Sequence, residues 1–462
     1  MDTVSAESYQ CVRYFCTTGS GLEPFLVDEV KRKLLAVDVE FISGRVFFTT
    51  GAAMESIIHL KSAERLFLLL HRSPPIRAPV NQAKAASVVQ QSVVGDSEVW
   101  KGALGTWSRL RARLTGAKTT RKRKREEGQD EEEEEDKHTE TQPSHPRDTQ
   151  SGVSEPQTDS EQPRTTFRVS CRSSGVVAKR FSPQDLSRLI GSAITKQLNW
   201  RAHLKEPDLE VNVYLSDDHC VVGILLSSHP LAKRSYIKHT GLRSTVAWAM
   251  TSVSNTKEGA VIIDPMCGVG TILLEAAQEC PNACFFGLDS DVGQLQKAAE
   301  NVEYAQLTGR VQLLQASAMG IPLPSGSVDV VICDVPFGRK FSCGSSMATA
   351  LPDIVKEMER VLCVGGSLVL LLSLQLSTLL KKKIVKDALP CPATTAAPSP
   401  ASDTLLSSET NAGVTHTHGE NAQLSDGLTL RPFCSLHTHS IHKVSLGNTD
   451  AVIHTYTKTH GH

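Results

Sequence analysis

The chain has 462 residues, and its 49 Lys and Arg nearly balance its 50 Asp and Glu, so the net charge of −1 does not by itself indicate a polyanionic partner. Its 12 cysteines include no Cys-x-x-Cys pair, which argues against a zinc ribbon and against a secreted disulfide framework. No apolar run approaches the roughly 18 residues of a membrane-spanning helix, and the N-terminus lacks a signal-peptide pattern. The composition predicts a soluble, intracellular protein of two or three domains with no membrane interaction.

Residues 1–110 are predicted to hold a small α+β unit of the ferredoxin-like type. Their hydrophobic periodicity indicates a strand, a helix, a second strand and a second helix. These four elements are expected at residues 12–18, 21–35, 46–49 and 52–70. No residue pattern in this part indicates chemistry.

Residues 111–164 are predicted to form a disordered, charged insertion. A basic run, Arg121–Arg125, precedes an acidic tract, Glu131–Asp136, and Ser, Thr, Gln and Pro follow. Such a segment buries too little apolar area to fold. The basic run fits both a nuclear localisation signal and an unspecific charged linker, and the sequence leaves both open.

Order is predicted to return over residues 165–230, as a strand, a helix and a strand pair. These elements are expected at residues 167–172, 183–198, 209–215 and 220–226. Between Arg164 and Arg243, thirteen Lys and Arg face six Asp and Glu, an excess of seven positive charges. This basic segment resembles a THUMP domain, an RNA-binding module of tRNA-modifying proteins. An ordinary solvated face of a small α/β domain has a similar composition.

A basic connection leads from this module into the next domain. Between His229 and Ala249 no acid occurs, and the cations are Lys233, Arg234, Lys238 and Arg243. In an enzyme with a separate RNA-binding module, RNA would pass here toward the active site, so these four are candidate RNA-binding residues. An ordinary basic linker fits the same pattern.

The stretch that follows predicts a strand, a glycine loop and a helix. Three apolar residues lead to Asp264, Gly268 and Gly270 permit a tight turn, and Thr271 is expected to cap the helix. The loop is neither a P-loop nor a Gly-x-Gly-x-x-Gly fingerprint. Its acidic entrance favours a ligand with hydroxyls and a cationic or amino-acid end, bound at the edge of an open α/β sheet.

Two further predicted strands end in acids. Asp289 follows Asp264 by 25 residues, which is near the spacing of a ribose-binding carboxylate. A later strand ends in Asp334-Val335-Pro336-Phe337. The Asp334 carboxylate and the Val335 carbonyl can accept hydrogen bonds from an exocyclic amine and so expose its lone pair. Pro336 stiffens the turn, and Phe337 offers a face for stacking a flipped-out base.

In this order and spacing, the three strand ends resemble the S-adenosylmethionine-dependent methyltransferases, and Asp-x-Pro-Phe resembles their amino-methylating (Asn/Asp)-Pro-Pro-(Tyr/Phe) branch. The resemblance implies an α/β fold: a Rossmann-like class I methyltransferase sheet preceded by an α+β ferredoxin-like and THUMP RNA-binding module. It implies S-adenosyl-L-methionine as the cofactor, with Asp289 on the ribose. At the adenine, Ser317 stands where relatives carry an acid, and the backbone N–H of Ala318 can contact the base. The methionine end would be lined by Asp264, Cys267, Gly268, Gly270 and Thr271.

The chain after these motifs is predicted to complete the methyltransferase domain over residues 231–386 and 436–462. A disordered insertion rich in Pro, Ala, Ser and Thr is expected at 387–435, before a closing strand pair around Gly447. Five histidines here match no metal-site spacing, so no metal is predicted. They are His416, His418, His437, His439 and His442.

Taken as a whole, the chain resembles the THUMP-containing guanosine N2-methyltransferases, on the strength of His229–Arg234, Lys238–Arg243 and Asp334–Arg339. The resemblance implies formation of N2-methylguanosine in a structured RNA: U6 small nuclear RNA for one member, tRNA for its relatives. It implies the nucleus, with the cytoplasm as an alternative. It also implies a heterodimer with a small zinc-containing activator subunit that pairs with the methyltransferase sheet.

Two other functions stay open at this point. Glutamine N5-methyltransferases of proteins also present an amide nitrogen to an Asn-Pro-Pro-Tyr turn, but the basic module and the acid at Asp334 favour RNA. A non-catalytic RNA-binding adaptor would have a decayed methyltransferase site. The intact acids, the two glycines and Phe337 argue against such decay.

Overall fold

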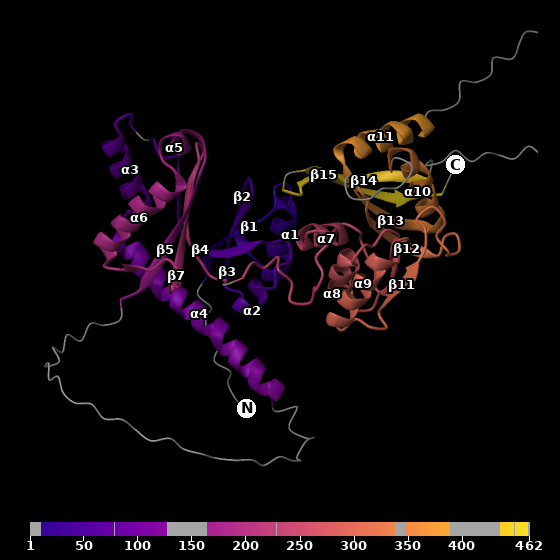
Figure 1. The fold of residues 1–462 in the computed structure, drawn as a ribbon, viewed down its shortest axis with the longest axis horizontal. Helices are drawn as coiled ribbons and strands as arrows, with labels where there is room; N and C mark the ends of the chain where they lie inside the picture. Colours follow the sequence, from indigo (N-terminus) through magenta and orange to yellow (C-terminus); the bar gives the residue numbers. More distant parts are fainter. Residues whose placement is uncertain are drawn as a thin grey trace, which may run out of the picture. The chain divides into compact units, whose positions relative to one another are not determined.

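A computed structural model of the protein describes residues 11–77, 79–126, 164–227, 229–337, 347–388, 435–447 and 449–460. The chain divides into two units (Figure 1). The first takes in residues up to 237 together with 242–249 and 444–448, and the second takes in 238–241, 250–443 and the residues from 449 onward.

The first unit is built on one eight-stranded sheet with the order β2-β3-β1-β4-β8-β7-β5-β6. Antiparallel pairing of β4 with β8 joins the strands of the N-terminal part to those that follow residue 164. The segments predicted separately over 1–110 and 165–230 therefore share one sheet. The strands are β1 Val12–Thr17, β2 Val37–Ile42, β3 Arg45–Thr50, β4 Arg65–Ser73, β5 Thr166–Ser173, β6 Arg201–Ala202, β7 Leu209–Leu215 and β8 Cys220–Leu225.

The helices that lie wholly within this unit bury apolar side chains in a single cluster on one face of the sheet. They are α1 Glu23–Leu34, α2 Met54–Ile57, α3 Gln82–Val94, α4 Ser97–Glu126, α5 Gly175–Arg180 and α6 Pro183–Leu198. The opposite face carries a smaller cluster of strand residues: Phe15, Phe47, Phe67, Tyr214 and Val221. Because neighbouring strand residues point to opposite faces, β1, β3, β4, β7 and β8 contribute to both clusters.

The prediction of a helix over residues 52–70 is wrong. Only Met54–Ile57 is helical, and the apolar residues after it belong to strand β4. Leu66 and Leu68 face the helices, whereas Phe67 faces the aromatic cluster, so all three are buried. A strand buried on both faces is a continuous apolar run, which periodicity alone does not separate from a buried helix.

The predicted insertion over 111–164 starts too early. Helix α4 continues from Ser97 to Glu126, through the predicted boundary. Trp100, Trp107 and Leu110 anchor it to the core, and the Lys and Arg residues that follow are good helix formers. Residues 127–163, and 389–434 of the second predicted insertion, lie outside the described residues.

The second unit contains a seven-stranded sheet with the order β11-β10-β9-β12-β13-β15-β14. The strands from β9 to β13 pair in parallel, and β15 pairs antiparallel with β13. The predicted closing strand pair is confirmed as β14 and β15. The strands are β9 Val261–Asp264, β10 Cys284–Asp289, β11 Val311–Gln315, β12 Val328–Asp334, β13 Leu362–Ser373, β14 Leu436–Ser445 and β15 Asp450–Lys458.

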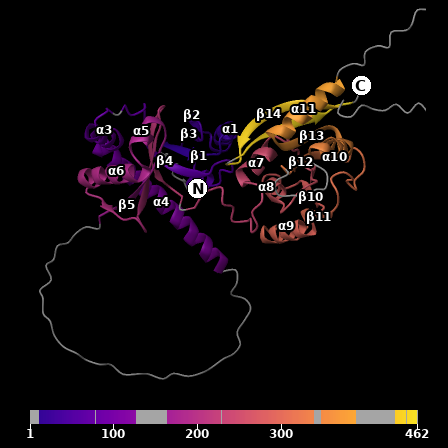
Figure 2. The same cartoon turned by 45° about the horizontal axis from the view of Figure 1, so that its top comes forward.

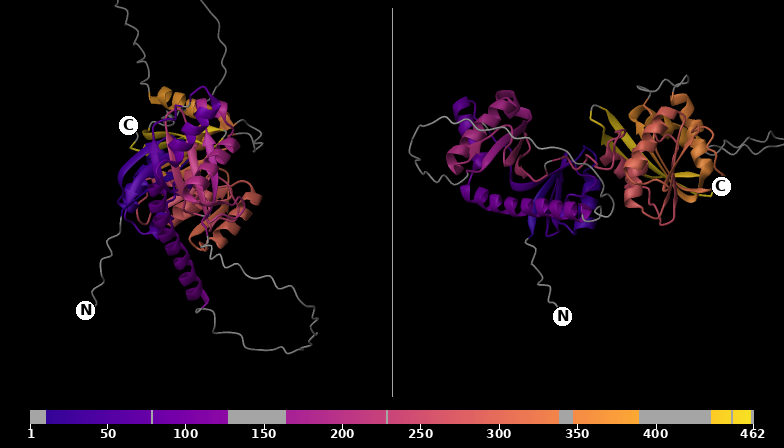
Figure 3. Two further views of the ribbon diagram at one scale, coloured as in Figure 1. Left: turned by 90° about the vertical axis from the view of Figure 1, so that its left-hand side faces the viewer. Right: turned by 60° about the horizontal axis from the view of Figure 1, so that its bottom comes forward.

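Helices cover both faces of this sheet (Figures 2 and 3). The helices α10 and α11 share an apolar cluster with Val331, Cys333 and Val335 of the β12 segment. Val330 and Ile332 point the other way and are equally buried, on the side where α8 and α9 pack on β9 and β10. The helices of this unit are α8 Thr271–Glu279, α9 Val292–Tyr304, α10 Met347–Val361 and α11 Leu374–Ala388, and α7 Ser244–Ser252 is divided between the two units after residue 249.

We expect Gly223→Ala to destabilise the first unit by about 1–3 kcal/mol, because an added methyl group overpacks the core. A Cβ at Gly223 would lie 2.4 Å from Cε1 of Phe15 and 2.7 Å from the carbonyl oxygen of Leu68. The free energy of unfolding from urea denaturation measures the effect. Gly105→Ala in helix α4 is the control, because its Cβ would meet nothing within 4 Å. Equal stability of the two variants would contradict this packing.

Candidate active site

Three carboxylates lie at the carboxyl ends of neighbouring parallel strands in the second unit. Asp264 ends β9, Asp289 ends β10 and Asp334 ends β12, and β9 lies between the other two. The chain reverses its direction of travel across the sheet between β9 and β12, and ligands of open α/β sheets bind at such a switch point. The structure thus brings together the acids that were predicted to form one site.

Asp264 is the most deeply buried of the three, with 1% of its surface exposed. Burial raises the pKa of its carboxyl well above the usual range, and the negative charges of Asp334 and Asp289 add to this effect. Its one opposing contact is a hydrogen bond of 3.2 Å from the backbone N–H of Met266. A positively charged ligand at this edge would relieve the repulsion between the acids.

The glycine loop is held to β10 by the second acid. The backbone N–H of Gly268 donates to Oδ2 of Asp289 at 2.9 Å, and that of Cys267 donates to the carbonyl of Leu288 at 2.9 Å. Gly268 and Gly270 have φ angles of 52° and 81°, in the left-handed region that favours glycine. The predicted tight turn is therefore present, and Asp289 helps to shape it.

Thr271 does not cap helix α8, contrary to the prediction. The cap residue is Gly270, and Thr271 is the first residue of the helix. The left-handed conformation that closes the turn requires glycine at the cap, which moves the threonine one position inward. The Thr271 side chain is buried, and in the described part of the chain its hydroxyl has no hydrogen-bond partner.

Cys267 lies beneath the loop and is inert. A Cβ on Gly287 would lie 3.0 Å from its sulfur, so the thiol packs against strand β10. Burial raises the pKa of the Cys267 thiol, which keeps it protonated and unreactive. Its contribution to the predicted site is to support the loop from below.

The turn after β12 continues the strand by one residue. The backbone N–H of Val335 donates to the carbonyl of Leu371 on β13 at 3.1 Å, and its side chain is fully buried. Burial raises the pKa of Asp334 to about 7. Pro336 and Phe337 are half-buried, and residues 338–346 lie outside the described residues.

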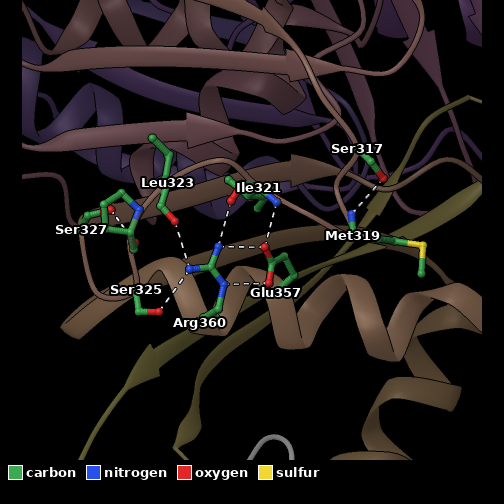
Figure 4. A network of polar contacts seen from close by, with 9 residues as sticks. Ser317, Met319, Ile321, Leu323, Ser325, Ser327, Glu357 and Arg360 are labelled. Carbon is green, nitrogen blue, oxygen red and sulfur yellow. Dashed lines mark hydrogen bonds and ion pairs between the residues drawn. The ribbon is translucent and has the colours of Figure 1, made fainter.

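Ser317 and Ala318 lie just after β11, where the resemblance places the adenine. The Ser317 hydroxyl accepts a hydrogen bond of 3.2 Å from the backbone N–H of Met319, and Ala318 is buried (Figure 4). The chain beyond is fixed by Glu357 and Arg360 of helix α10, which bind the backbone of Ile321 (Figure 4). The serine that replaces the family's acid thus forms a turn, and the neighbouring helix holds that turn in place.

Asn301 is a residue that the sequence analysis missed. It is fully buried on α9, where its Oδ1 accepts the backbone N–H groups of Lys238 and His239 at 2.9 and 2.7 Å. Its amide donates to the carbonyls of His239 and Val269, the latter in the glycine loop, at 2.9 and 2.8 Å. This side chain therefore ties residues 238–241 to the loop. One asparagine in a helical pattern gives no sequence signal for such a role.

The four predicted RNA-binding cations are in different situations. Lys233 is exposed, and Lys238 and Arg243 are exposed but form ion pairs with Glu300 and Glu64. Arg234 is only 8% exposed and donates to the backbone carbonyls of Leu231 and Lys61, both at 2.6 Å. Arg234 therefore holds the connection onto the first unit, which its position in a basic linker does not reveal, and its prediction as an RNA contact is corrected.

Comparison with known proteins identifies the family. Residues 232–387 match the RMKL-like methyltransferase domain, and residues 153–225 match the THUMP domain. The U6 snRNA (guanine-N(2))-methyltransferase THUMPD2 of Bos taurus is 39% identical, with 97% of this chain and 96% of the relative covered. The chain belongs to the family of THUMP-domain guanine-N2 RNA methyltransferases. The Homo sapiens THUMPD2 is 38% identical over 97% of this chain and 96% of its own length.

A second branch of the family matches a shorter part. The tRNA (guanine(6)-N(2))-methyltransferase THUMP3 of Bos taurus is 31% identical over 45% of this chain and 43% of its own length. Among solved structures, TrmN from Thermus thermophilus is 19% identical, with a TM-score of 0.59 over 97% of this chain and 100% of that one. The predicted family, enzyme class, α/β fold and methyl donor, S-adenosylmethionine, are confirmed.

Among the described helices none is long and apolar enough to cross a membrane. The described residues also contain no group of three or more His, Cys, Asp or Glu side chains that could hold a metal ion.

We expect Asp289→Ala to weaken binding of S-adenosylmethionine by about 1–3 kcal/mol, the range for hydrogen bonds to a charged group. The variant removes a candidate ribose acceptor and releases the Gly268 N–H from its partner. Calorimetry measures the affinity. Glu303→Ala, which removes an exposed acid from α9, is the control. An affinity equal to that of the control would exclude Asp289 from the cofactor site.

The raised pKa of Asp334 predicts a pH-dependent stability difference. At a pH between about 4, the usual pKa of an aspartate, and about 7, the pKa of Asp334 in the folded protein, the Asp334 carboxyl is protonated in the folded protein and ionised in the unfolded chain. The wild type should therefore lose stability relative to Asp334→Asn as pH rises through this window, and the gap should stay constant above it. Urea denaturation at pH 4.5, 6, 7 and 8 tests this. If the difference in the free energy of unfolding between wild type and Asp334→Asn does not change above pH 4.5, the pKa of Asp334 is not raised in the folded protein.

Proposed function

We propose that the protein methylates the N2 amine of a guanosine in U6 small nuclear RNA, with S-adenosylmethionine as methyl donor. The Asp334 turn beside Asp264 and Asp289 carries the proposal, because it combines an amine-binding acceptor with the cofactor edge of the sheet. Similarity over nearly the full length to enzymes named for U6 supports this RNA. A guanosine in tRNA is the second candidate, supported by the partial match to the tRNA enzymes.

The chemistry of the residues at the strand ends fits the cofactor. A carboxylate has about four lone-pair positions, and Asp289 uses two of them for the N–H groups of Gly268 and Asp291. It can therefore still accept hydrogen bonds from the ribose hydroxyls. The Thr271 hydroxyl, which has no partner among the described residues, and the Cβ-free Gly268 suit the methionine end, while Gly270 lets the loop pack closely on Ala298 of α9. When bound, the cofactor supplies an electrophilic methyl group on a sulfonium.

The residues of the turn after β12 handle the amine. Asp334 and the carbonyl of Val335 accept its hydrogen bonds and hold the lone pair in position, which is the main requirement of an in-line transfer. With a pKa of about 7, Asp334 can also take the proton that the amine loses on methylation. Pro336 limits the flexibility of the turn, and Phe337 offers a stacking face for the extruded guanine.

We further propose the small zinc-containing activator subunit as a partner. The proposal rests on the edge strand β14, whose Ile441 has 44% of its surface exposed. An exposed edge strand can pair with a second chain. Co-expression followed by size-exclusion chromatography tests the heterodimer, and Ile441→Lys should weaken it. Elution of a stable, active single chain without the subunit would contradict it.

We also propose that the protein is located in the nucleus, because its proposed substrate is a small nuclear RNA. The basic run Arg121–Arg125 is the candidate signal. Fluorescent fusions with and without the five cations compare the locations. Cytoplasmic wild-type fusion would favour the tRNA alternative.

We expect Asp334→Ala to lose most of its turnover while it still binds cofactor and RNA. The hydrogen bond from the amine to Asp334 matters chiefly in the transition state, when the nitrogen forms its bond to the methyl group. The substitution should therefore lower kcat rather than weaken binding. Asp334→Asn should be milder, because its amide oxygen still accepts a hydrogen bond. Single-turnover kinetics on U6 and tRNA transcripts measure both.

Lys233→Glu is the matched contrast, because it changes an exposed cation outside the three strand ends. It should weaken RNA association, with near-normal turnover at saturating RNA. If Asp334→Ala kept near-normal turnover, the turn would be structural and the amine-methylation proposal would fail.

A further inference from the structure

The sheet face opposite the helices of the first unit is a surface that the proposed reaction does not yet use. Its centre is the cluster of Phe15, Phe47, Phe67 and Tyr214, which is built from strand residues. The three phenylalanines are fully buried, and Tyr214 is 6% exposed. In the described part of the chain, the helices contribute no residue to this cluster, so the rings are shielded from solvent by side chains of the sheet itself.

Arginines lie over two of these rings, Tyr214 and Phe47. The side chains that alternate with the helix-facing residues on β1, β3, β4 and β5 include six arginines. The guanidinium of Arg45 lies 3.9 Å from the ring centroid of Tyr214, and that of Arg72 lies 4.7 Å from the ring centroid of Phe47. We define this arginine face by Arg13, Arg45, Arg65, Arg72, Arg168 and Arg172.

Two glutamates form ion pairs with three of these six arginines, so they balance two of the six positive charges. Glu40 pairs with Arg13 at 3.1 Å and with Arg72 at 2.7 Å, and Glu210 pairs with Arg168. Arg45, Arg65 and Arg172 have no acidic partner among the described residues. Among the described residues, the six arginines of the face therefore carry four positive charges more than the two carboxylates that pair with them.

Two of the unbalanced cations are close neighbours. Arg172 is the cross-strand partner of Tyr214, the ring that Arg45 covers. Burial lowers the pKa of Arg45, and the positive charge of Arg172 adds to the lowering. The Nε of Arg45 is buried without a hydrogen-bond partner among the described residues. Juxtaposed like charges destabilise a fold, so their presence indicates an external anion.

The shape of the face suits an extended ligand. Strands β3 and β7 are separated by β1, β4 and β8, so on a flat sheet they would lie about 19 Å apart. The contact of Arg45 with Tyr214 therefore requires the sheet to curl toward this face. A hollow of about 610 Å³ lies beside it, and its charged and titratable lining residues are Arg13, Glu40, His71, Arg72, Asp218 and His219.

We propose that the arginine face binds the phosphate backbone of the substrate RNA, an inference that rests on the proposed function and adds its main RNA-contacting surface. Guanidinium groups bind phosphates in a bidentate manner, and three of them lack an internal acid. The buried rings cannot stack bases, so the contact is to the backbone and is independent of sequence. The same face spans the strands on both sides of the β4–β8 pairing.

The test replaces Arg45, Arg65 and Arg172 together by Gln, which keeps a polar side chain at each position and removes three charges. The control replaces three exposed cations of the helix-covered side, Lys179, Arg188 and Lys196, by Gln. Binding of U6 transcript and of bulk tRNA is measured between 50 and about 300 mM salt, with the full-length protein. Circular dichroism and cofactor calorimetry verify that both variants fold.

The arginine variant should bind both RNAs at least about tenfold more weakly, and its slope of log K against log [salt] should fall by about 2–3, or 0.7–0.9 per lost phosphate contact. The control variant should match the wild type. Equal loss in the two variants would mean that only net charge matters, and an unchanged slope would mean that no phosphates are bound. Poly-glutamate that competes with wild-type binding as well as RNA does would indicate an acidic protein partner. Each of these three outcomes overturns the proposal.

The outcome is separable from that of the proposed reaction. Loss of RNA binding in a protein whose wild type methylates no RNA would support the face and refute the reaction. Normal binding by the arginine variant of an active enzyme would refute the face alone.

Discussion

The parallel pairing of β9 with β10 and β12 is the constraint on which the catalytic unit depends. Because parallel strands end at one edge of a sheet, it forces Asp264, Asp289 and Asp334 into proximity. Burial then raises the pKa of two of these acids. The negative charges of these acids at the edge of the sheet are therefore unfavourable unless a cation binds beside them. The positively charged sulfonium of S-adenosylmethionine is such a cation.

Several backbone contacts convert that edge into a shaped site. Asp289 holds Gly268, Asn301 holds Val269, and Glu357 with Arg360 holds the chain after Ser317. In each case a side chain binds backbone groups of a loop that would otherwise be mobile. Transfer reactions depend on positioning, so these supporting residues contribute through the geometry of the loops that they hold.

In our proposal the first unit has a different task, that of binding the phosphate backbone of the RNA. Its single sheet buries one face under helices and leaves the other to aromatic rings beneath arginines. The glutamates Glu40 and Glu210 neutralise part of that charge, which limits self-repulsion. We propose that the remaining cations attract the RNA independently of its sequence and that the site around Asp334 selects the guanosine.

The sequence by itself determined the local elements whose signals are short-range. The strand ends at Asp264, Asp289 and Asp334, helix α6 and the closing strand pair follow from apolar runs bounded by turn residues. The motif order identified the family for the same reason, since a strand end fixes where its acid lies. Two local predictions were wrong. Strand β4 was predicted as a helix, because a strand that is buried on both faces shows no alternation of apolar and polar residues. Thr271 was predicted as the cap of α8, but the cap is Gly270 in the left-handed conformation.

Only the tertiary structure decided which polar residues are buried and what they hold. Arg234 looks like an RNA contact in a basic linker but binds two carbonyls, and Asn301 looks like an ordinary helix residue but secures the glycine loop. The arginines of the sheet face are scattered between residues 13 and 172 and form one surface only because β4 pairs with β8. Such long-range pairings carry no local pattern, because partners far apart in the chain meet only when the sheet forms.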